Sequence, residues 1–121
     1  MAISSKELEF NFNDDQMRLK ISALEQQLSK IYEGGGKKRV EKLHASGKLT
    51  ARERIDLLLD PNTERVEIGA LAGYGMYKEH GGCPSGGVVV VIGYIKGKQC
   101  IVVANDATVK AGAWFPITGK K

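Results

Sequence analysis

The sequence predicts an α/β (α+β) domain in which helices precede a buried sheet. Two apolar runs, residues 88–92 and 100–104, flank the two-residue break Lys96-Gly97, which is the pattern of a β-hairpin. Neither run alternates with polar residues, as is typical of strands that are covered on both faces. Helical periodicity is found before these runs. A sheet covered on both faces and preceded by helices belongs to a layered α/β or α+β fold.

The N-terminal region, residues 1–33, is predicted to hold an arm and one amphipathic helix. Residues 1–12 are polar with scattered apolar positions and predict a loose or extended arm. Asn13, with Gln16 three residues later, is the expected N-cap of a helix that ends at the triglycine 34–36. One stripe of apolar residues runs along this helix: Met17, Ile21, Leu24, Leu28 and Ile31. We expect the stripe to pack against the protein's own domain or a sister subunit, with a dedicated partner helix as the alternative.

A basic segment follows the triglycine. Residues 34–54 hold seven cations and two anions, a net charge of +5 compared with +4 for the whole chain. A short helix is predicted to end near Gly47. Thr50 and Glu53 form a capping box for a second helix, in which we expect Ile55, Leu58 and Leu59 to be buried.

The next element is predicted at residues 66–70. Val66, Ile68 and Ala70 alternate with polar neighbours, which predicts a strand whose polar side, with Glu67, faces water. In the hairpin that follows, Gly97 supplies the positive φ that a type I′ turn needs. Polar residues come directly after its second strand, where sites gather in sheet-based folds.

Length and composition bound the class of protein. A chain of 121 residues with 42% hydrophobic and 26% charged residues suits one ordinary globular domain. No apolar run approaches the roughly 18 residues of a membrane span, so no membrane association is expected. Two cysteines do not make a disulfide framework and indicate a reducing compartment. The first twenty residues carry four acidic side chains, unlike a mitochondrial transit peptide, so we expect a cytoplasmic protein.

The polar residues do not assemble a familiar catalytic or metal motif. His80 and Cys83 stand three residues apart, but His44 and Cys100 do not form a second pair, so we expect no metal site and a packing role for the thiol. Ser85 lies outside any Gly-x-Ser-x-Gly motif. The glycine-rich loops instead offer backbone N–H groups, which can stabilise oxyanions.

Two long motifs carry a resemblance to a known family. Residues 34–60 read GGGKKRVEKLHASGKLTARERIDLLLD, and residues 80–118 read HGGCPSGGVVVVIGYIKGKQCIVVANDATVKAGAWFPIT. In this order they resemble the start of the carboxyltransferase β subunit of biotin-dependent acyl-CoA carboxylases, and methylcrotonyl-CoA carboxylase most of all. One position departs: where family members often read Lys-Gly-Gly-Thr, this chain has Ala111 after Lys110, which keeps the site small but loses the conformational freedom of glycine.

The resemblance implies a fold, a reaction and partners. The fold is the crotonase-like ββα superhelix, of which residues 34–121 would be the incomplete beginning. The complete subunit, a homo-hexamer, would move a carboxyl group from carboxybiotin, carried by an α subunit, to an acyl-CoA. Backbone N–H groups beyond residue 121 would hold the enolate and the biotin oxygen, so no catalytic residue is assigned to this chain.

The resemblance also implies where acyl-CoA would bind. Four residues of the loop after the second hairpin strand are candidates for lining the site: Asn105, Thr108, Lys110 and Gly112. In the basic segment, Lys37, Lys38 and Arg39 are candidates for the phosphates of coenzyme A. Two alternatives stay open for that segment, a solvated face and a nucleic-acid footprint. The absence of interleaved aromatic residues makes nucleic acid the least favoured partner.

Two hypotheses of different class follow. In the first, the chain is the N-terminal part of a carboxyltransferase subunit and acts only when the subunit is complete. In the second, it is a small basic, non-catalytic binding or assembly module. The start of a helix at Pro116 favours the first, because an independent module has no need of it.

Overall fold

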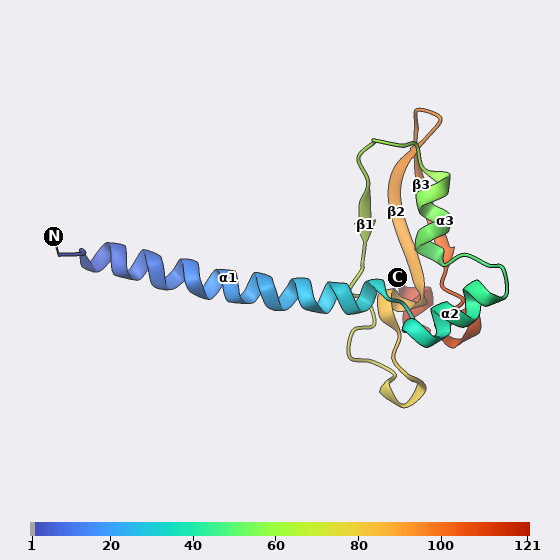
Figure 1. Ribbon diagram of the computed structural model, residues 1–121, viewed down its shortest axis with the longest axis horizontal. Helices are drawn as coiled ribbons and strands as arrows, with labels where there is room; N and C mark the ends of the chain where they lie inside the picture. Colours follow the sequence, from blue (N-terminus) through green and yellow to red (C-terminus); the bar gives the residue numbers. More distant parts are fainter. Residues whose placement is uncertain (1) are drawn as a thin grey trace.

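The computed structural model describes residues 2–121 and combines a small antiparallel sheet with four α-helices (Figure 1). The sheet has three strands in the order β1-β2-β3. The elements, in chain order, are α1 (Ser5–Tyr32), α2 (Lys37–Ala45), α3 (Ala51–Leu58), β1 (Val66–Ile68), β2 (Val88–Ile95), β3 (Lys98–Asn105) and α4 (Pro116–Lys120).

Helix α1 begins earlier than the sequence suggested. Ser4, not Asn13, is its N-cap: the Ser4 hydroxyl accepts from the Glu7 N–H at 3.2 Å, and the Glu7 carboxylate accepts from the Ser4 N–H at 2.8 Å. This capping box satisfies N–H groups that would otherwise have no partner at the helix start. The predicted arm of residues 1–12 is therefore wrong from Ser5 onward, and the helix runs for 28 residues.

The apolar stripe of α1 is exposed over most of its length. Met17, Ile21 and Leu24 keep 56%, 48% and 42% of their surface exposed, and only Ile31 is buried. Figure 1 shows the reason: the helix projects away from the sheet and meets the rest of the chain only at its C-terminal end. Within the described chain, the expected packing of the stripe against the protein's own domain is therefore found only at that end.

The predicted hairpin is confirmed. Strands β2 and β3 pair in antiparallel register from Val88 opposite Asn105 to Ile95 opposite Lys98. The turn residues Lys96 and Gly97 have φ of 49° and 76°, both positive as in a type I′ turn. The Asp60 carboxylate, just after α3, accepts hydrogen bonds of 2.7 Å from both turn N–H groups. The turn and the end of α3 are therefore tied together.

Helix α3 covers one face of the sheet. The capping box predicted at its start is present, with Thr50 and Glu53 exchanging hydrogen bonds. Its buried residues join those of the sheet in a core of Ala51, Ile55, Leu59, Val89, Val91 and Ala104. A Cβ at Gly93 would lie 2.9 Å from the Leu59 side chain. The absence of a side chain at Gly93 therefore lets the end of α3 pack closely against β2. Leu58, expected to be buried, is 49% exposed at the last residue of the helix.

The opposite face of the sheet is apolar and open. The register aligns two rows across the three strands, and we call these six residues the open sheet face: Val66, Ile92 and Ile101 in one row, and Ile68, Val90 and Val103 in the other. Val66, Ile101 and Val103 are each more than 60% exposed. The expectation that both faces are covered is therefore wrong for the described chain.

Strand β1 also faces the other way from the prediction. Val66 and Ile68 are exposed on the open sheet face, whereas the Glu67 side chain is only 18% exposed on the face that α3 covers. The reason is electrostatic, because Arg52 of α3 reaches the sheet there and pairs with Glu67. In the part of the chain that the structure describes, no helix is both long and apolar enough to cross a membrane.

The open sheet face generates a prediction for the isolated 121-residue chain. Each uncovered Val or Ile forgoes about 1.5–3 kcal/mol of burial, so a few of them equal the stability of a small domain. We expect the chain alone to unfold without a sharp transition and to self-associate, as measured by differential scanning calorimetry and sedimentation. The double variant Ile101→Thr/Val103→Thr should reduce self-association more than Leu57→Thr, a control on the exposed side of α3. A sharp two-state transition of a soluble monomer would contradict this expectation.

Candidate functional site

The loop of residues 106–112 follows β3 and turns the side chains of Asp106 and Thr108 inward. Asp106 and Thr108 are 8% and 4% exposed. One Asp106 carboxylate oxygen accepts from the Thr108 N–H at 2.9 Å and from the Thr108 hydroxyl at 2.5 Å. The Asp106 N–H donates to the Gly87 carbonyl at 3.0 Å. The start of the loop is therefore fixed by its own side chains and by the segment that enters β2.

Thr108 also fastens the triglycine to this loop. The Gly35 N–H donates to the Thr108 hydroxyl at 2.8 Å, and the Arg39 guanidinium donates to the Thr108 carbonyl at 3.3 Å. A Cβ at Gly35 would lie 1.9 Å from the Thr108 carbonyl oxygen, so only glycine fits this approach. Helix α2 is in this way held against the 106–112 loop.

A cationic cavity lies between α2 and the loop. It has a volume of about 450 Å³, and three cations line it: Arg39, Lys42 and Lys110. The other lining residues are Leu43, Ser46, Ala107, Thr108 and Ala111, none of which is acidic. Three positive groups around one hollow attract a multiply charged anion. We call this hollow the cationic cavity.

The floor of the loop has an unusual backbone. Lys110, Ala111 and Gly112 have φ of 47°, 53° and 84°, so three consecutive residues are left-handed. A non-glycine residue pays about 1–2 kcal/mol for this conformation. The Lys110 ammonium lies 4.3 Å from the centre of the Phe115 ring, a cation–π contact that orients the side chain. Ala111 therefore replaces the glycine that family members often have, at a position where the backbone is left-handed and where glycine would fit without strain.

The structure gathers some of the predicted site residues and separates others. Arg39, Thr108 and Lys110 line the cationic cavity together. Lys37 instead lines a neighbouring hollow that also contains Glu33, Glu53 and Asp106, and Lys38 lines neither of the two hollows. All of these cations, including those of the cationic cavity, are exposed to solvent. Asn105 accepts a hydrogen bond of 3.1 Å from the Trp114 indole. Gly112 is half-buried, with Ala107 beside it.

Residues that the sequence did not single out support the same region. Lys42 belongs to the basic segment of residues 34–54, but its place in the cationic cavity depends on the direction of α2. Asp106 could have been found, because Asp-x-Thr after a strand is a pattern in which the carboxylate binds the backbone two residues on. No local signal marks Arg52 and Glu67 as a half-buried pair.

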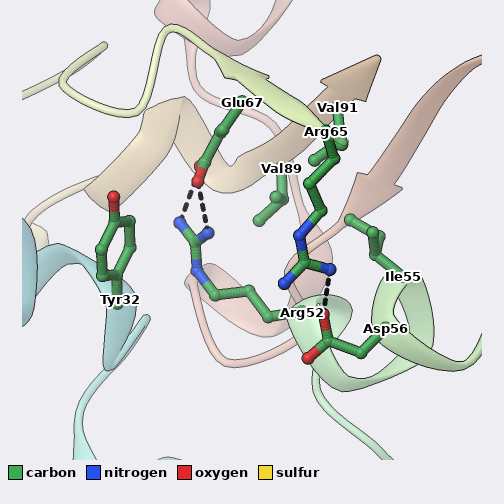
Figure 2. Close-up of a pocket in the computed structure, with 8 residues that line it drawn as sticks. All are labelled: Tyr32, Arg52, Ile55, Asp56, Arg65, Glu67, Val89 and Val91. Carbon is green, nitrogen blue, oxygen red and sulfur yellow. Dashed lines mark hydrogen bonds and ion pairs between the residues drawn. The ribbon is translucent and has the colours of Figure 1, made fainter. Parts of the chain in front are cut away.

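That pair lines a second cavity, of about 480 Å³, shown in Figure 2. The Arg52 guanidinium donates to both Glu67 oxygens at 2.6 and 2.8 Å and lies 4.5 Å from the centre of the Tyr32 ring. Arg65 is paired with Asp56 across the same hollow. Each charge that lines this cavity therefore has an opposite partner, and the arrangement serves packing better than the binding of a charged ligand.

The segment that enters β2 is held by buried polar contacts. Ser85 is 3% exposed with φ of 54°, and its hydroxyl donates to the Ala70 carbonyl at 3.2 Å and accepts from Arg52 at 3.1 Å. The Lys121 ammonium donates to the carbonyls of Ser85 and Val88 at 2.8 and 2.7 Å. Burial lowers the pKa of Lys121. The Ser85 hydroxyl is therefore engaged in structural hydrogen bonds with Ala70 and Arg52.

Cys83 packs in a small apolar cluster with Val109 and Phe115 and is 2% exposed. Burial raises the pKa of its thiol, and the Thr118 hydroxyl and the nearby lysines oppose that rise. Both cysteines are free, and Cys100 is partly exposed. The packing role predicted for the Cys83 thiol agrees with this environment.

Comparison with known proteins matches residues 42–121 to the carboxyl transferase domain. The chain is 43% identical over 119 residues to a protein of Drosophila melanogaster described as a probable mitochondrial methylcrotonoyl-CoA carboxylase beta chain, covering 98% of this chain and 20% of that one. It is 44% identical over 112 residues to the biotin-dependent 3-methylcrotonyl-coenzyme A carboxylase beta1 subunit of Mycobacterium tuberculosis, covering 92% and 20%.

A solved structure gives the same picture. The transcarboxylase 12S hexamer with bound methylmalonyl-coenzyme A matches with a TM-score of 0.77 and 35% identity, covering 87% of this chain and 21% of that one. The chain thus spans about one fifth of the length of the relatives that it matches.

The environment of Cys83 leads to a prediction about its chemistry. A raised thiol pKa keeps the group protonated near neutral pH, and the thiolate is the reactive form. At pH 8 we expect iodoacetamide to modify Cys100 and to leave Cys83 unmodified until the chain is denatured, as read by peptide mass spectrometry. Neither cysteine should bind metal: stoichiometric zinc in purified protein that is lost on Cys83→Ser, but kept on Cys100→Ser, would contradict this.

Proposed function

Because this chain belongs to the carboxyl transferase domain family, we propose that it forms the first part of an acyl-CoA carboxylase β subunit. When complete, the subunit transfers a carboxyl group from carboxybiotin to an acyl-CoA. The observation that carries the proposal is the cationic cavity, which is lined by the predicted site residues Arg39, Thr108 and Lys110, the last two within the family match. The substrate we propose is similar to methylcrotonyl-CoA, after the substrates named for the relatives.

The proposed division of the chain follows its architecture. Residues 1–33 form a segment of their own, dominated by α1, and residues 34–121 begin the crotonase-like N-terminal domain, consistent with the likeness to the transcarboxylase fold. We propose that the rest of that domain covers the open sheet face. Six aligned apolar side chains need a partner layer, and the relatives are about five times longer than this chain.

The cationic cavity suits the phosphates of coenzyme A. Arg39 offers a planar fork of donors, and Lys42 and Lys110 add two compact charges around the same hollow. Thr108 forms part of its wall and fixes the loop through Asp106. Lys37 and Lys38 lie outside the cavity on the same helix, so their proposed part is long-range attraction of the anionic substrate.

The chemistry proposed for the subunit needs few side chains from this segment. Carboxybiotin, carried by a partner subunit, supplies the carboxyl group, and no residue of this chain is assigned to hold it. The part of residues 34–121 is to bind and orient the acyl-CoA, with Asn105 and Gly112 at the edge of the 106–112 loop. We propose no metal in this reaction and no catalytic residue in this segment.

The partners and compartment are proposed on similar grounds. The transcarboxylase relative assembles as a hexamer, and we propose a homo-hexamer that joins a biotin-carrying α subunit. Two free cysteines fit a reducing compartment, for which we propose the cytoplasm, although the Drosophila relative is described as mitochondrial. Neither nucleic acid nor a membrane is a proposed partner. A small non-catalytic basic module is less favoured, because such a module would leave the open sheet face in water.

The proposed role of the cationic cavity is tested by charge removal in the complete subunit. We expect Lys42→Gln/Lys110→Gln to raise the KM for acyl-CoA about tenfold, because both cations face the cavity. The matched variant Lys37→Gln/Lys38→Gln removes the same charge outside it, and should raise KM only about twofold and only at low salt. Steady-state kinetics at two ionic strengths measure both. Equal KM values for both variants and the parent protein would contradict the proposed role and favour the alternative that these cations form a solvated face.

The isolated 121-residue chain should have no carboxyltransferase activity. The backbone donors that would hold the reacting anions are expected beyond residue 121, and removal of such donors costs at least about a hundredfold in rate. The measurement is transfer of labelled carboxyl from carboxybiotin to several acyl-CoAs, with the complete subunit as the positive control. Turnover by the short chain above the background of a heat-denatured sample would contradict the expectation.

A further inference from the structure

Helix α1 is too exposed to be explained by the fold around it. With 28 residues it is about 42 Å long, and only its last turns meet the rest of the chain (Figure 1). Most helical stability in proteins comes from packing of an apolar face. The first half of α1 nevertheless carries large apolar side chains that water surrounds, among them Phe10, 70% exposed, and Phe12, 62% exposed. Exposed apolar side chains gathered on one element are typical of an interaction surface.

One side of α1 has the spacing of a coiled-coil seam. Phe10, Met17, Ile21, Leu24 and Leu28 follow one another at seven, four, three and four residues, and we call them the α1 seam. Asp14 occupies the missing position, where its carboxylate is paired with Arg18 at 2.7 Å. Leu19 lies on the opposite side, also exposed. The seam spans nearly three heptads, which suits a helical partner of similar length.

The charges of α1 indicate which partner fits. Its first eleven residues, 5–15, carry a net charge of −3, from Lys6 against Glu7, Glu9, Asp14 and Asp15. Its remaining residues, 16–32, carry a net charge of +2, from Arg18, Lys20 and Lys30 against Glu25. Two parallel copies would place like charges side by side, whereas two antiparallel copies place each acidic half along a basic half.

We propose that α1 pairs antiparallel with α1 of a second copy of this chain, through the α1 seam. Such a contact is isologous, with the same surface contributed by both copies. It does not depend on the proposed reaction or on the cationic cavity, because α1 lies outside both.

A hollow at the base of α1 supports this arrangement. It has a volume of about 400 Å³, and α1 contributes Gln27, Lys30 and Ile31 to its lining. The loop before β2 contributes Tyr74 and Met76, which are 57% and 43% exposed. In an antiparallel pair the first turns of each helix lie beside the last turns of the other, and so reach this hollow. The exposed Phe10 side chain, which belongs to the α1 seam, then has an apolar surface to cover.

Photo-cross-linking from α1 identifies the surface that covers the α1 seam. A benzophenone side chain is introduced at Phe10 in the complete subunit, and 15N-labelled and unlabelled copies are mixed before illumination. We expect the cross-link to join two copies and to attach to residues 24–34 or 71–83, as mapped by mass spectrometry. Attachment near residue 10 of the second copy would mean a parallel pair and would overturn the proposal. So would attachment to a different protein, to the same copy, or to residues beyond 121.

A matched pair of variants measures the strength of the contact. Ile21→Lys places a charge in the α1 seam, whereas Leu19→Lys places the same charge on the opposite side of the same helix. We expect the first to lower the yield of the inter-copy cross-link about tenfold and the second to change it less than twofold. Circular dichroism of each variant shows whether the helix persists. Equal yields in two variants that keep their helix would overturn the role of the seam.

Discussion

The contact between the triglycine and Thr108 holds the two halves of this chain together. Residues 35 and 108 are 73 positions apart, yet the Gly35 N–H and the Thr108 hydroxyl are in hydrogen-bond contact, and there is no room for a side chain between them. Asp106 fixes the hydroxyl, and Arg39 adds a second bond from the beginning of α2. Because one wall of the cationic cavity comes from α2 and the other from the 106–112 loop, the cavity exists only while this contact does.

Features set by near neighbours in the sequence could be predicted. The β2–β3 hairpin, its turn at Lys96 and Gly97, and the capping box of α3 are determined by residues within a few positions of one another. The start of α1 differs from the prediction for a local reason, since the serine and glutamate that cap it lie inside the segment predicted to be an arm. The orientation of β1 could not be predicted, because Glu67 faces inward only when Arg52 is opposite it in space.

The candidate site shows the same limit. The sequence indicated that polar residues after β3 and cations after the triglycine belong to one function, and Arg39, Thr108 and Lys110 do line one cavity. Lys37 and Lys42 carry the same charge in the same helix, but the direction of α2 places only Lys42 in that cavity. Asn105 is occupied by the Trp114 indole, a contact across nine residues with no pattern of its own. The residue types in the sequence thus indicate the region of the site, and the packing of α2 against the 106–112 loop determines which residues line it.

The left-handed backbone at Ala111 restricts how this loop can change in evolution. Glycine fits its φ of 53° without cost, alanine pays a modest strain, and a β-branched residue would pay much more. Asparagine and aspartate tolerate the conformation, but aspartate would bring a negative charge to the wall of the cationic cavity. Glycine, alanine and asparagine are therefore the accessible states, and a lineage that needs a differently shaped pocket must change it elsewhere. Position 111 can therefore change among these three residues but not to larger or β-branched side chains.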